Sequence, residues 1–488
     1  MELHLKTAHE LNSLIKAKEI SSSELTKSFL SRIDKIDSDV SAYTEILSQK
    51  ALEKAQEVDK KIAAGEGLNA IAGIPIAIKD NICTNGIKTT CSSKMLENFV
   101  PPYDATVVTK LKGADSVFIG KTNMDEFAMG NTTETSYFKK THNPYNLEYT
   151  PGGSSGGSAA AVSAGEAVFA LGSDTGGSIR QPAAFCGVVG LKPSYGTVSR
   201  NGLIAFGSSL DQIGPITKDV TDAALLLNAI VGHDSAETTS LKREYPDFTN
   251  NINSGVKGLK IGLPKEYFET GVKDEAKKAV LDAAKAFEAL GATVTECSLP
   301  LTKYGVSVYH IISMAEASSN MGKFDGIKFG YQADNIEDLE DLYCKSRTEG
   351  FGEEVKRRTM LGTYFICDGQ FDKYFSRAQK VRTLMVKSFN EVFQSFDLLL
   401  TPATLDTAWK LSSKEDDIVK AYSQDICTVS ANIAGLPAIS LPFTIAQNGL
   451  PLGVQLIGKH LDDATILRSA YALEQTVSIA APSYCKED

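Results

Sequence analysis

Apolar, strand-like runs alternate with amphipathic helical segments along most of the chain after residue 73. Residues 274–290 have helical periodicity, stop at Gly291 and are followed by a strand-like run at 292–295. A helical pattern at 105–111 likewise precedes a run at 116–119, and further apolar runs lie at 396–400, 438–441 and 453–457. This alternation is typical of an α/β fold in which helices cover both faces of a mixed, mostly parallel sheet.

The domain organisation is predicted from the lack of repeats and linkers in the sequence. The 488 residues contain no internal repeat and no clear linker, so we expect one large domain over 1–488. Ser21 and Glu24 form a capping-box pattern ahead of residues 25–36, and residues 46–63 have the charge pattern of an exposed helix. We therefore expect N-terminal helices over about 1–65, a core over about 70–230 and room for a cap or insertion at about 300–420.

Two serines lie in glycine-rich turns. Ser154 belongs to the segment 150–158 and Ser178 to the segment 174–180, so the two are 24 residues apart. Glycines around a serine permit a sharp turn and let backbone N–H groups approach a reacting carbonyl. A flexible Gly/Ser linker is the alternative. Both segments, however, adjoin the apolar stretch 159–171, which reads as buried helix and strand, so catalytic serines are favoured.

The base expected beside these serines is a lysine. The six histidines are scattered, and none lies in a glycine-rich turn. Lys79 ends an apolar run that begins at Gly73 and is followed by Asp80 and Asn81, which predicts a buried strand. Burial disfavours the ammonium form, so such a lysine can act as a neutral base near pH 7. A lone lysine at a strand end more often reaches solvent, but its place beside two glycine-framed serines favours catalysis.

Three motifs carry a resemblance to a known family. GIPIAIKD at 73–80, GGSSGGS at 152–158 and DTGGSIR at 174–180 resemble the amidase signature family, and the similarity extends over nearly the whole chain. The resemblance implies a Ser–Ser–Lys triad with Ser178 as nucleophile, Ser154 as bridging hydroxyl and Lys79 as base. Backbone N–H groups of the second glycine-rich turn would stabilise the oxyanion, namely those of Thr175, Gly176, Gly177 and Ser178.

Other segments are similar to one branch of that family, the glutaminase subunits of tRNA-dependent amidotransferases. They lie at 121–130, 316–320, 324–326 and 354–358. The resemblance implies that Arg358 binds the substrate α-carboxylate and Asp425 the α-ammonium, with a hydrogen bond from Tyr309. It also assigns Met129 and Gly130 to the substrate site. From the residues alone, Arg358 could equally be a surface helix charge and Asp425 a helix-start residue.

The loop 121–130 contains two motifs that need interpretation. Gly120, Lys121 and Thr122 follow an apolar run as in a phosphate-binding loop, but Asp115 stands where that loop requires a glycine. Nucleotide binding is therefore not expected in this chain. We expect the loop to line the site at the end of a strand. Asp125 and Glu126 are either helix-start carboxylates or catalytic groups, and the sequence leaves both open.

The charge balance bears on partners. Fifty basic against 60 acidic residues give a net charge of −10 without a polybasic run, so this chain alone should bind tRNA poorly. The resemblance implies glutamine as substrate, a partner subunit that binds tRNA and uses ATP and Mg, and a small third subunit. It implies no cofactor in this chain.

The alternatives are a stand-alone amidase for small or aryl amides and an inactive scaffold, and intact Lys79, Ser154 and Ser178 argue against the scaffold. The choice between Glu-tRNA and Asp-tRNA would reside in the partner.

The remaining composition predicts a cytoplasmic enzyme. The eight cysteines include no C-x-x-C pair, so we expect reduced thiols and no metal site. The first six residues are charged and lack the apolar core of a signal peptide. The most apolar stretch, 159–172, is interrupted by Ser163 and Glu166 and is too short to span a bilayer.

Overall fold

A single large sheet runs through the molecule. The computed structural model describes residues 2–269, 271–413 and 418–482. Within these residues the sheet has 11 strands in the order β1-β3-β2-β4-β6-β5-β10-β11-β9-β7-β8. The strands are β1 Tyr43–Ile46, β2 Pro75–Lys79, β3 Val117–Thr122, β4 Phe169–Asp174, β5 Val189–Lys192, β6 Gln212–Thr217, β7 Lys260–Pro264, β8 Thr293–Cys297, β9 Leu398–Pro402, β10 Ala438–Ile445 and β11 Pro451–Gly458.

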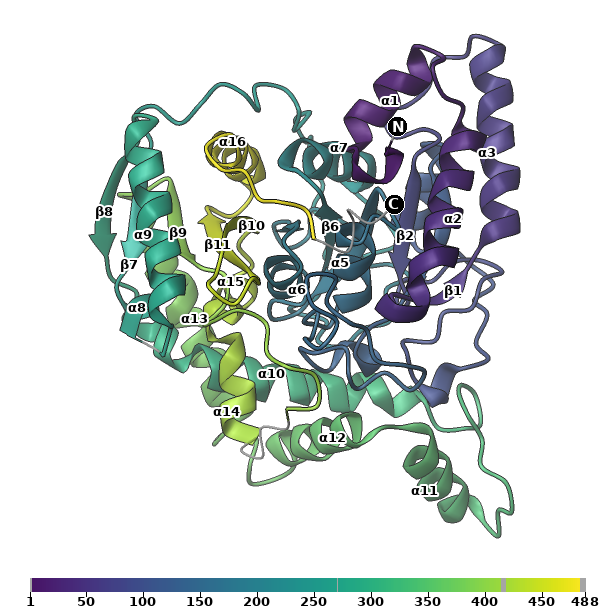
Figure 1. Cartoon of the computed structure of the whole chain (residues 1–488). Helices are drawn as coiled ribbons and strands as arrows, with labels where there is room; N and C mark the ends of the chain where they lie inside the picture. The colour runs from purple at the N-terminus through teal and green to yellow at the C-terminus, as the bar shows by residue number, and fades with distance from the viewer. Residues whose placement is uncertain (1, 270, 414–417, 483–488) are drawn as a thin grey trace.

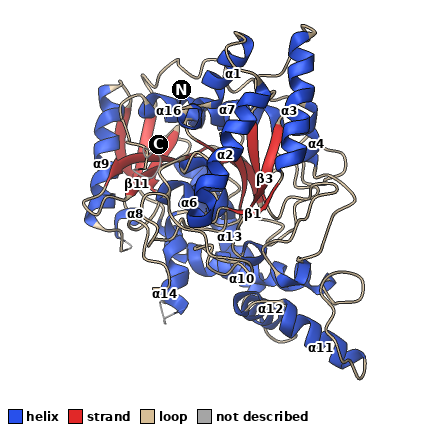
Figure 2. Ribbon diagram, turned by 45° about the vertical axis from the view of Figure 1, so that its right-hand side comes forward, coloured by secondary structure: helices blue, strands red, loops and turns tan. Residues whose placement is uncertain are grey.

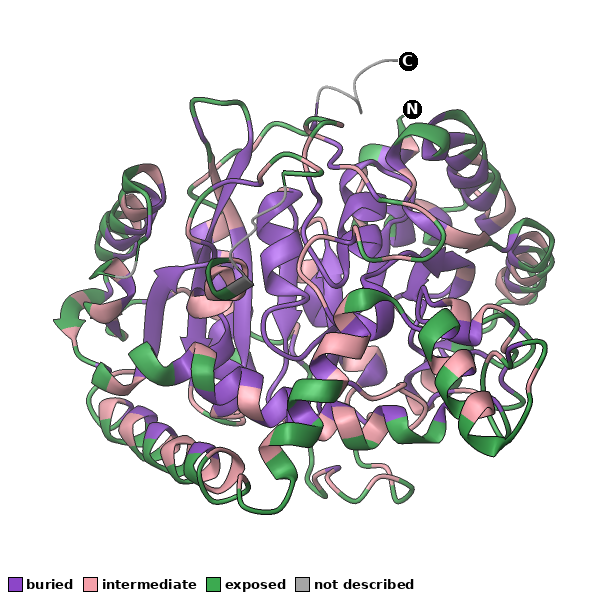
Figure 3. Cartoon of the chain, turned by 90° about the horizontal axis from the view of Figure 1, so that it is seen from below, coloured by how far each residue is buried: buried purple, intermediate pink, exposed green. Residues whose placement is uncertain are grey.

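Helices pack against both faces of this sheet, and its central strands are almost wholly buried, whereas the edge strand β8 is not (Figures 2 and 3). The α-helices are α1 Ala8–Lys16, α2 Ser22–Val40, α3 Ser48–Ala63, α4 Thr106–Gly113, α5 Gly156–Ser163, α6 Arg180–Phe185, α7 Val220–Ile230, α8 Glu266–Glu269, α9 Asp274–Ala289, α10 Gly305–Asn320, α11 Leu339–Gly350, α12 Glu353–Ile366, α13 Phe375–Val392, α14 Ile418–Ser423, α15 Val429–Ile433 and α16 Asp463–Glu474. Short 3₁₀ turns include η2 Lys94–Leu96, η3 Glu126–Ala128 and η6 Gln424–Cys427. The expected mixed α/β fold is confirmed.

The expectation that parallel pairs would dominate the sheet is wrong. Of the ten pairings between neighbouring strands in the described residues, four are parallel and six antiparallel. The parallel pairs join β2 to β3 and β4, and β7 to β8 and β9. Strands β10 and β11 instead form a hairpin, because the short connection between Ile445 and Pro451 leaves no room for a crossover helix.

The N-terminal helices follow the expected pattern with one change. Ser21 and Glu24 form the capping box at the start of α2, since Ser21 Oγ accepts the Glu24 N–H at 3.1 Å and Glu24 Oε2 accepts the Ser21 N–H at 2.8 Å. The next helix begins at Ser48 rather than at Ile46. Ile46 instead pairs with Gly120 as the last residue of the edge strand β1. Four residues are too short a strand to show a clear alternation in sequence.

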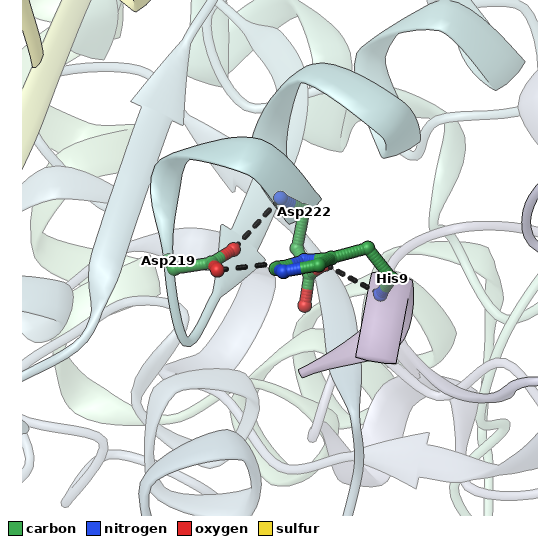
Figure 4. A group of neighbouring side chains, drawn as sticks. All are labelled: His9, Asp219 and Asp222. Carbon is green, nitrogen blue, oxygen red and sulfur yellow. Dashed lines mark hydrogen bonds and ion pairs between the residues drawn. The ribbon is translucent and has the colours of Figure 1, made fainter. Parts of the chain in front are cut away.

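A carboxylate pair ties the first helix to the body of the protein. Asp222 of α7 accepts the backbone N–H groups of Ala8 and His9 at 2.6 and 3.1 Å, at the start of α1. The His9 ring adds a contact to Asp222 at 3.0 Å and to Asp219 at 3.5 Å (Figure 4). The hydrogen bond to Asp222 raises the pKa of His9. Asp222 therefore supplies acceptors at the start of α1, and the His9 ring adds a further link between α1 and α7.

The helices α10 to α13 form a layer below the sheet in the view of Figure 1. Helix α10 packs against both α12 and α13, and α11 projects beyond them. Tyr309 belongs to α10 and Arg358 to α12, so this layer carries two of the residues expected to bind substrate. No helix within the described residues is long and apolar enough to cross a membrane. The seven cysteines that the structure describes are all free thiols, and Cys485 lies outside the described residues.

Candidate active site

Lys79 stands at the carboxyl end of β2 and is completely buried. Its Nζ lies 2.7 Å from Ser154 Oγ and 2.8 Å from Ser155 Oγ, and it is 3.3 Å from the carbonyl oxygen of Ser173. Ser155 Oγ in turn donates to that same carbonyl at 3.1 Å. Strand β2, the turn before α5 and the end of β4 thus fix the amine from three sides.

The pKa of Lys79 is lowered to about 7, and burial is the main cause. The carboxylates of Asp125, Asp174 and Asp211 oppose this effect through their charge. Near neutrality the amine is therefore present in both its charged and its neutral form. A neutral amine beside a serine hydroxyl can accept the hydroxyl proton.

Ser154 and Ser178 belong to adjoining turns. Ser154 precedes α5, whereas Ser178 lies between β4 and α6, and the Ser155 N–H donates to the Ser178 carbonyl at 3.1 Å. Ser154 is fully buried, while Ser178 retains 8% of its accessible surface. Among the described residues, the Ser178 hydroxyl has no hydrogen-bond partner. The structure thus joins Ser154 directly to Lys79 and leaves the Ser178 hydroxyl without a partner among the described residues.

The turn that carries Ser178 is held by a buried ion pair. Arg180 donates from Nη2 to Asp174 Oδ1 and from Nε to Asp174 Oδ2, both at 3.0 Å. Burial alone would raise the pKa of Asp174, but the Arg180 charge holds it below its usual range. Asp174 Oδ1 also accepts the Gly177 N–H at 2.8 Å. This bond engages one of the four N–H groups expected to face an oxyanion, which leaves those of Thr175, Gly176 and Ser178 as the candidate donors.

Arg358 reaches a cavity of about 660 Å³ from α12. Its guanidinium lies between the rings of Phe206 and Tyr422, at 5.5 and 5.3 Å from their centroids. Its Nε donates to Glu354 Oε1 at 2.7 Å, one helical turn earlier. Burial would lower the pKa of Arg358, but the Glu354 charge raises it above its ordinary value, so the group stays cationic. A fixed, charged guanidinium of this kind is suited to binding a carboxylate.

Asp425 supplies a carboxylate within electrostatic range of Arg358. It lies in η6 and accepts a hydrogen bond from Asn131 Nδ2 at 3.2 Å. Burial raises the pKa of Asp425 to about 6, while the Asn131 hydrogen bond and the Arg358 charge oppose the rise. Asn131 is also among the residues that line the cavity of Arg358. A bound cation beside Asp425 would favour its charged form.

Tyr309 and Gly130 connect this region to the serine turns. A side chain at Gly176 would bring its Cβ to 2.5 Å from Tyr309 Cζ, so the ring packs directly on the backbone of the Ser178 turn. Gly130 lines the cavity, and a Cβ there would overlap the carboxylate of Asp125. Met129 is buried beside it. Lys79, Ser154 and Ser178 are not among the cavity-lining residues.

Comparison with known proteins identifies the family. A family model described as Amidase matches residues 24–467. The chain belongs to the amidase family. It is 54% identical over 475 residues to the A subunit of glutamyl-tRNA(Gln) amidotransferase from Heliobacterium modesticaldum, with 97% of each chain covered. The A subunit of the same enzyme from Carboxydothermus hydrogenoformans is 56% identical, with 97% of this chain and 98% of that protein covered.

Solved structures of the amidase family agree with this assignment. The A subunit of glutamyl-tRNA(Gln) amidotransferase from Thermotoga maritima is 42% identical, has a TM-score of 0.82 and is covered to 98%, as is this chain. A bacterial aryl acylamidase of the same family is 28% identical, with a TM-score of 0.86 and 100% of this chain and 99% of that chain covered. The expected family and fold are therefore confirmed.

Several residues of this amidase-family site were not singled out in the sequence. Ser155 contacts Lys79 as closely as Ser154 does, and its place in GGSSGGS was an available signal. Asn131, Phe206 and Tyr422 come from separate segments, and nothing local in the sequence marks them. Asp211 was not singled out either, although its Oδ1 accepts a hydrogen bond from the Thr175 hydroxyl at 2.6 Å. Within the described residues, the one group with spacing suited to a metal is His9, Asp219 and Asp222, of which Asp222 also accepts two backbone N–H groups at the start of α1.

Proposed function

We propose that this chain is the glutaminase subunit of a tRNA-dependent amidotransferase. The observation that carries the proposal is that a buried guanidinium, Arg358, lies within electrostatic range of a carboxylate, Asp425, and that Tyr309, which both charges influence, packs against the Ser178 turn. A free amino acid substrate requires both charges, because it presents an α-carboxylate and an α-ammonium. The names of the relatives, which are amidotransferase A subunits, support the same conclusion.

In the proposed mechanism, neutral Lys79 accepts the proton of Ser154. Ser154 takes the proton of Ser178 as Ser178 Oγ attacks the side-chain carboxamide carbon of glutamine. The tetrahedral oxyanion is stabilised by N–H groups of the glycine-rich turn, chiefly those of Thr175, Gly176 and Ser178. The reverse relay protonates the leaving nitrogen, so ammonia departs and a glutamyl ester of Ser178 remains. Water then attacks the ester with the same relay as its base.

Substrate recognition uses the opposite charges of Arg358 and Asp425. Arg358 binds the α-carboxylate through the guanidinium nitrogens that Glu354 does not engage, and Asp425 binds the α-ammonium. Tyr309 contributes a hydrogen bond, and the backbone of Met129 and Gly130 forms the wall of the site. The layer of α10 to α13 acts as the cap of a single domain over 1–488, because it carries Arg358 and Tyr309 over the serine turns.

The ammonia is used by a partner. A partner subunit binds Glu-tRNA(Gln), and Asp-tRNA(Asn) where the pathway requires it, activates the aminoacyl carboxylate with ATP and Mg, and accepts the ammonia. A small third subunit completes the complex, which is cytoplasmic. The net charge of −10 supports this division, because phosphate binding by this chain alone would be weak. No cofactor is required in this chain, since the serine and lysine supply the chemistry.

Copurification of the native chain tests the proposal. We expect a stable complex that converts Glu-tRNA(Gln) to the amide with glutamine and ATP. The likeness to an aryl acylamidase supports the second candidate, a stand-alone amidase. A monomer that is fully active on aryl amides and gives no amidation of charged tRNA with any copurifying protein would establish that alternative.

A further inference from the structure

Glu126 is a buried carboxylate whose two oxygens face different segments. It lies in η3, after β3, and retains 3% of its accessible surface. Ser93 donates its hydroxyl to Glu126 Oε1. Glu126 Oε2 accepts the backbone N–H of Gly352 at 2.8 Å, across 226 residues of chain. The carboxylate therefore connects the loop that follows β3 to the residue preceding α12.

Gly352 is the N-cap residue of α12, and as a glycine it has no side chain that could cap the helix. The first N–H groups of a helix need an acceptor from outside the helix. In a capping box, a glutamate of the same helix bonds to the N-cap N–H. Glu126 supplies that acceptor from another segment. A Cβ at Gly352 would overlap Glu126 Oε2, so the carboxylate occupies the space that a capping side chain would need.

Helix α12 also carries Arg358, six residues beyond this cap. Arg358 is held by Glu354, which stands in the first turn of the helix and also accepts the Tyr422 hydroxyl at 2.7 Å. A shift at the start of α12 would therefore move Glu354 and the guanidinium together. Glu126, Gly352 and Arg358 line the same cavity, so the cap and the arginine border one space.

We propose that Glu126 is a positioning residue for glutamine: by capping α12 through Gly352, it holds Arg358 where the α-carboxylate of the substrate binds. This inference rests on the glutaminase function proposed above and adds a residue outside the serine and lysine cluster. Without the cap, the first turn of α12 has a smaller population in the binding-competent position. The apparent affinity for glutamine falls in proportion to the fraction of molecules in which α12 is in the binding-competent position. The rate of the bound complex is unaffected.

The electrostatic surroundings of Glu126 set the conditions for a test. Burial raises its pKa to about 7, and the bonds from Ser93 and Gly352 and the charge of Lys356 oppose that rise. Glu353 and Glu354 of α12 and Glu134 also line this cavity. At pH 8 the Glu126 carboxylate is mostly ionised and can accept from both donors. Kinetic assays at pH 8 therefore measure the enzyme with the Glu126 carboxylate bonded to the Gly352 N–H.

The test measures KM and kcat for glutamine in the enzyme purified with whatever subunits accompany it. Glu126→Ala is expected to raise KM about tenfold, with kcat changed less than about threefold. Glu126→Gln keeps an acceptor for the Gly352 N–H and should restore KM to near the parent value. Gly352→Ala disrupts the same contact at the helix. The added Cβ of residue 352 would displace the Glu126 carboxylate, so KM should rise as it does in Glu126→Ala. If Glu126→Ala does not fold, Gly352→Ala tests the cap in its place.

Glu349→Ala is the matched control, because it removes an exposed carboxylate from α11, three residues before Gly352, without touching the Gly352 bond or the cavity, and KM should stay unchanged. Unchanged KM in both Glu126→Ala and Gly352→Ala would overturn the positioning role. So would a loss confined to kcat, or a Glu126→Gln variant as impaired as Glu126→Ala. A parent enzyme that does not hydrolyse glutamine at all would instead overturn the proposed function, and this inference with it.

Discussion

Removing Lys79 from water disfavours its ammonium form, and this lowers its pKa to about 7. The neutral form, which is the one that can accept a proton, is populated above that value. We therefore predict that kcat for glutamine rises with pH through about 7 and then levels off. Lys79→Met should abolish turnover while the far-UV circular dichroism stays that of the parent. A variant with a near-parental rate and the same pH profile would remove Lys79 from the mechanism.

Arg358 gives a second prediction at the scale of single residues. Arg358→Ala leaves the substrate carboxylate unpaired, at a cost of about 2–4 kcal/mol in kcat/KM for glutamine. Small amides without a carboxylate should lose far less. Arg357→Ala is the control, since Arg357 also pairs with Glu354 but is 36% exposed. Equal losses for glutamine and for a small amide would show that Arg358 is structural.

At the scale of elements, the turn between β4 and α6 depends on Arg180. This side chain is fully buried, pairs with Asp174 and also donates to the Thr428 carbonyl at 3.1 Å and to Gln455 Oε1 at 2.6 Å. It thus joins the turn to the segment before α15 and to strand β11.

We predict that Arg180→Ala lowers the free energy of unfolding by about 3–5 kcal/mol, because it leaves the Asp174 carboxylate buried without its partner. The midpoint of urea unfolding measures this loss. Lys278→Ala removes an exposed ion pair with Asp282 on α9 and should leave the midpoint unchanged. A parental midpoint in Arg180→Ala would show that Asp174 is compensated by other groups.

Sequence patterns predicted individual elements better than their connections. The run ending at Lys79 is a buried strand, and the helix expected at 274–290 is Asp274–Ala289, because apolar periodicity and glycine stops are local signals. Whether neighbouring strands run parallel depends on the chain path between them, which periodicity does not encode. The same limit applies to the site. The glycine-framed serines were visible in one segment, whereas Asn131, Gly352 and Glu126 acquire their roles from contacts across the fold.

At the scale of the whole molecule, the proposed function requires another protein to use the ammonia that this acidic chain would release. The net charge is −10, and the only site chemistry that we assign to this chain is amide hydrolysis. Activation of the tRNA-borne carboxylate would take place on the partner. The two half-reactions should therefore be separable by a single substitution in this chain.

Ser178→Ala provides that separation. It removes one hydroxyl from a glycine-rich turn and leaves the Asp174–Arg180 pair in place, so the fold and the assembly with partners should persist. Glutamine hydrolysis should fall by several orders of magnitude, as it does when a serine nucleophile is removed. Added ammonium salt should nevertheless support amidation of the charged tRNA in the mutant complex, because the partner still activates the carboxylate. Loss of the ammonia-dependent reaction in a complex that assembles normally would refute this division. A stand-alone amidase would give no such rescue, since it has no second reaction for ammonia to enter.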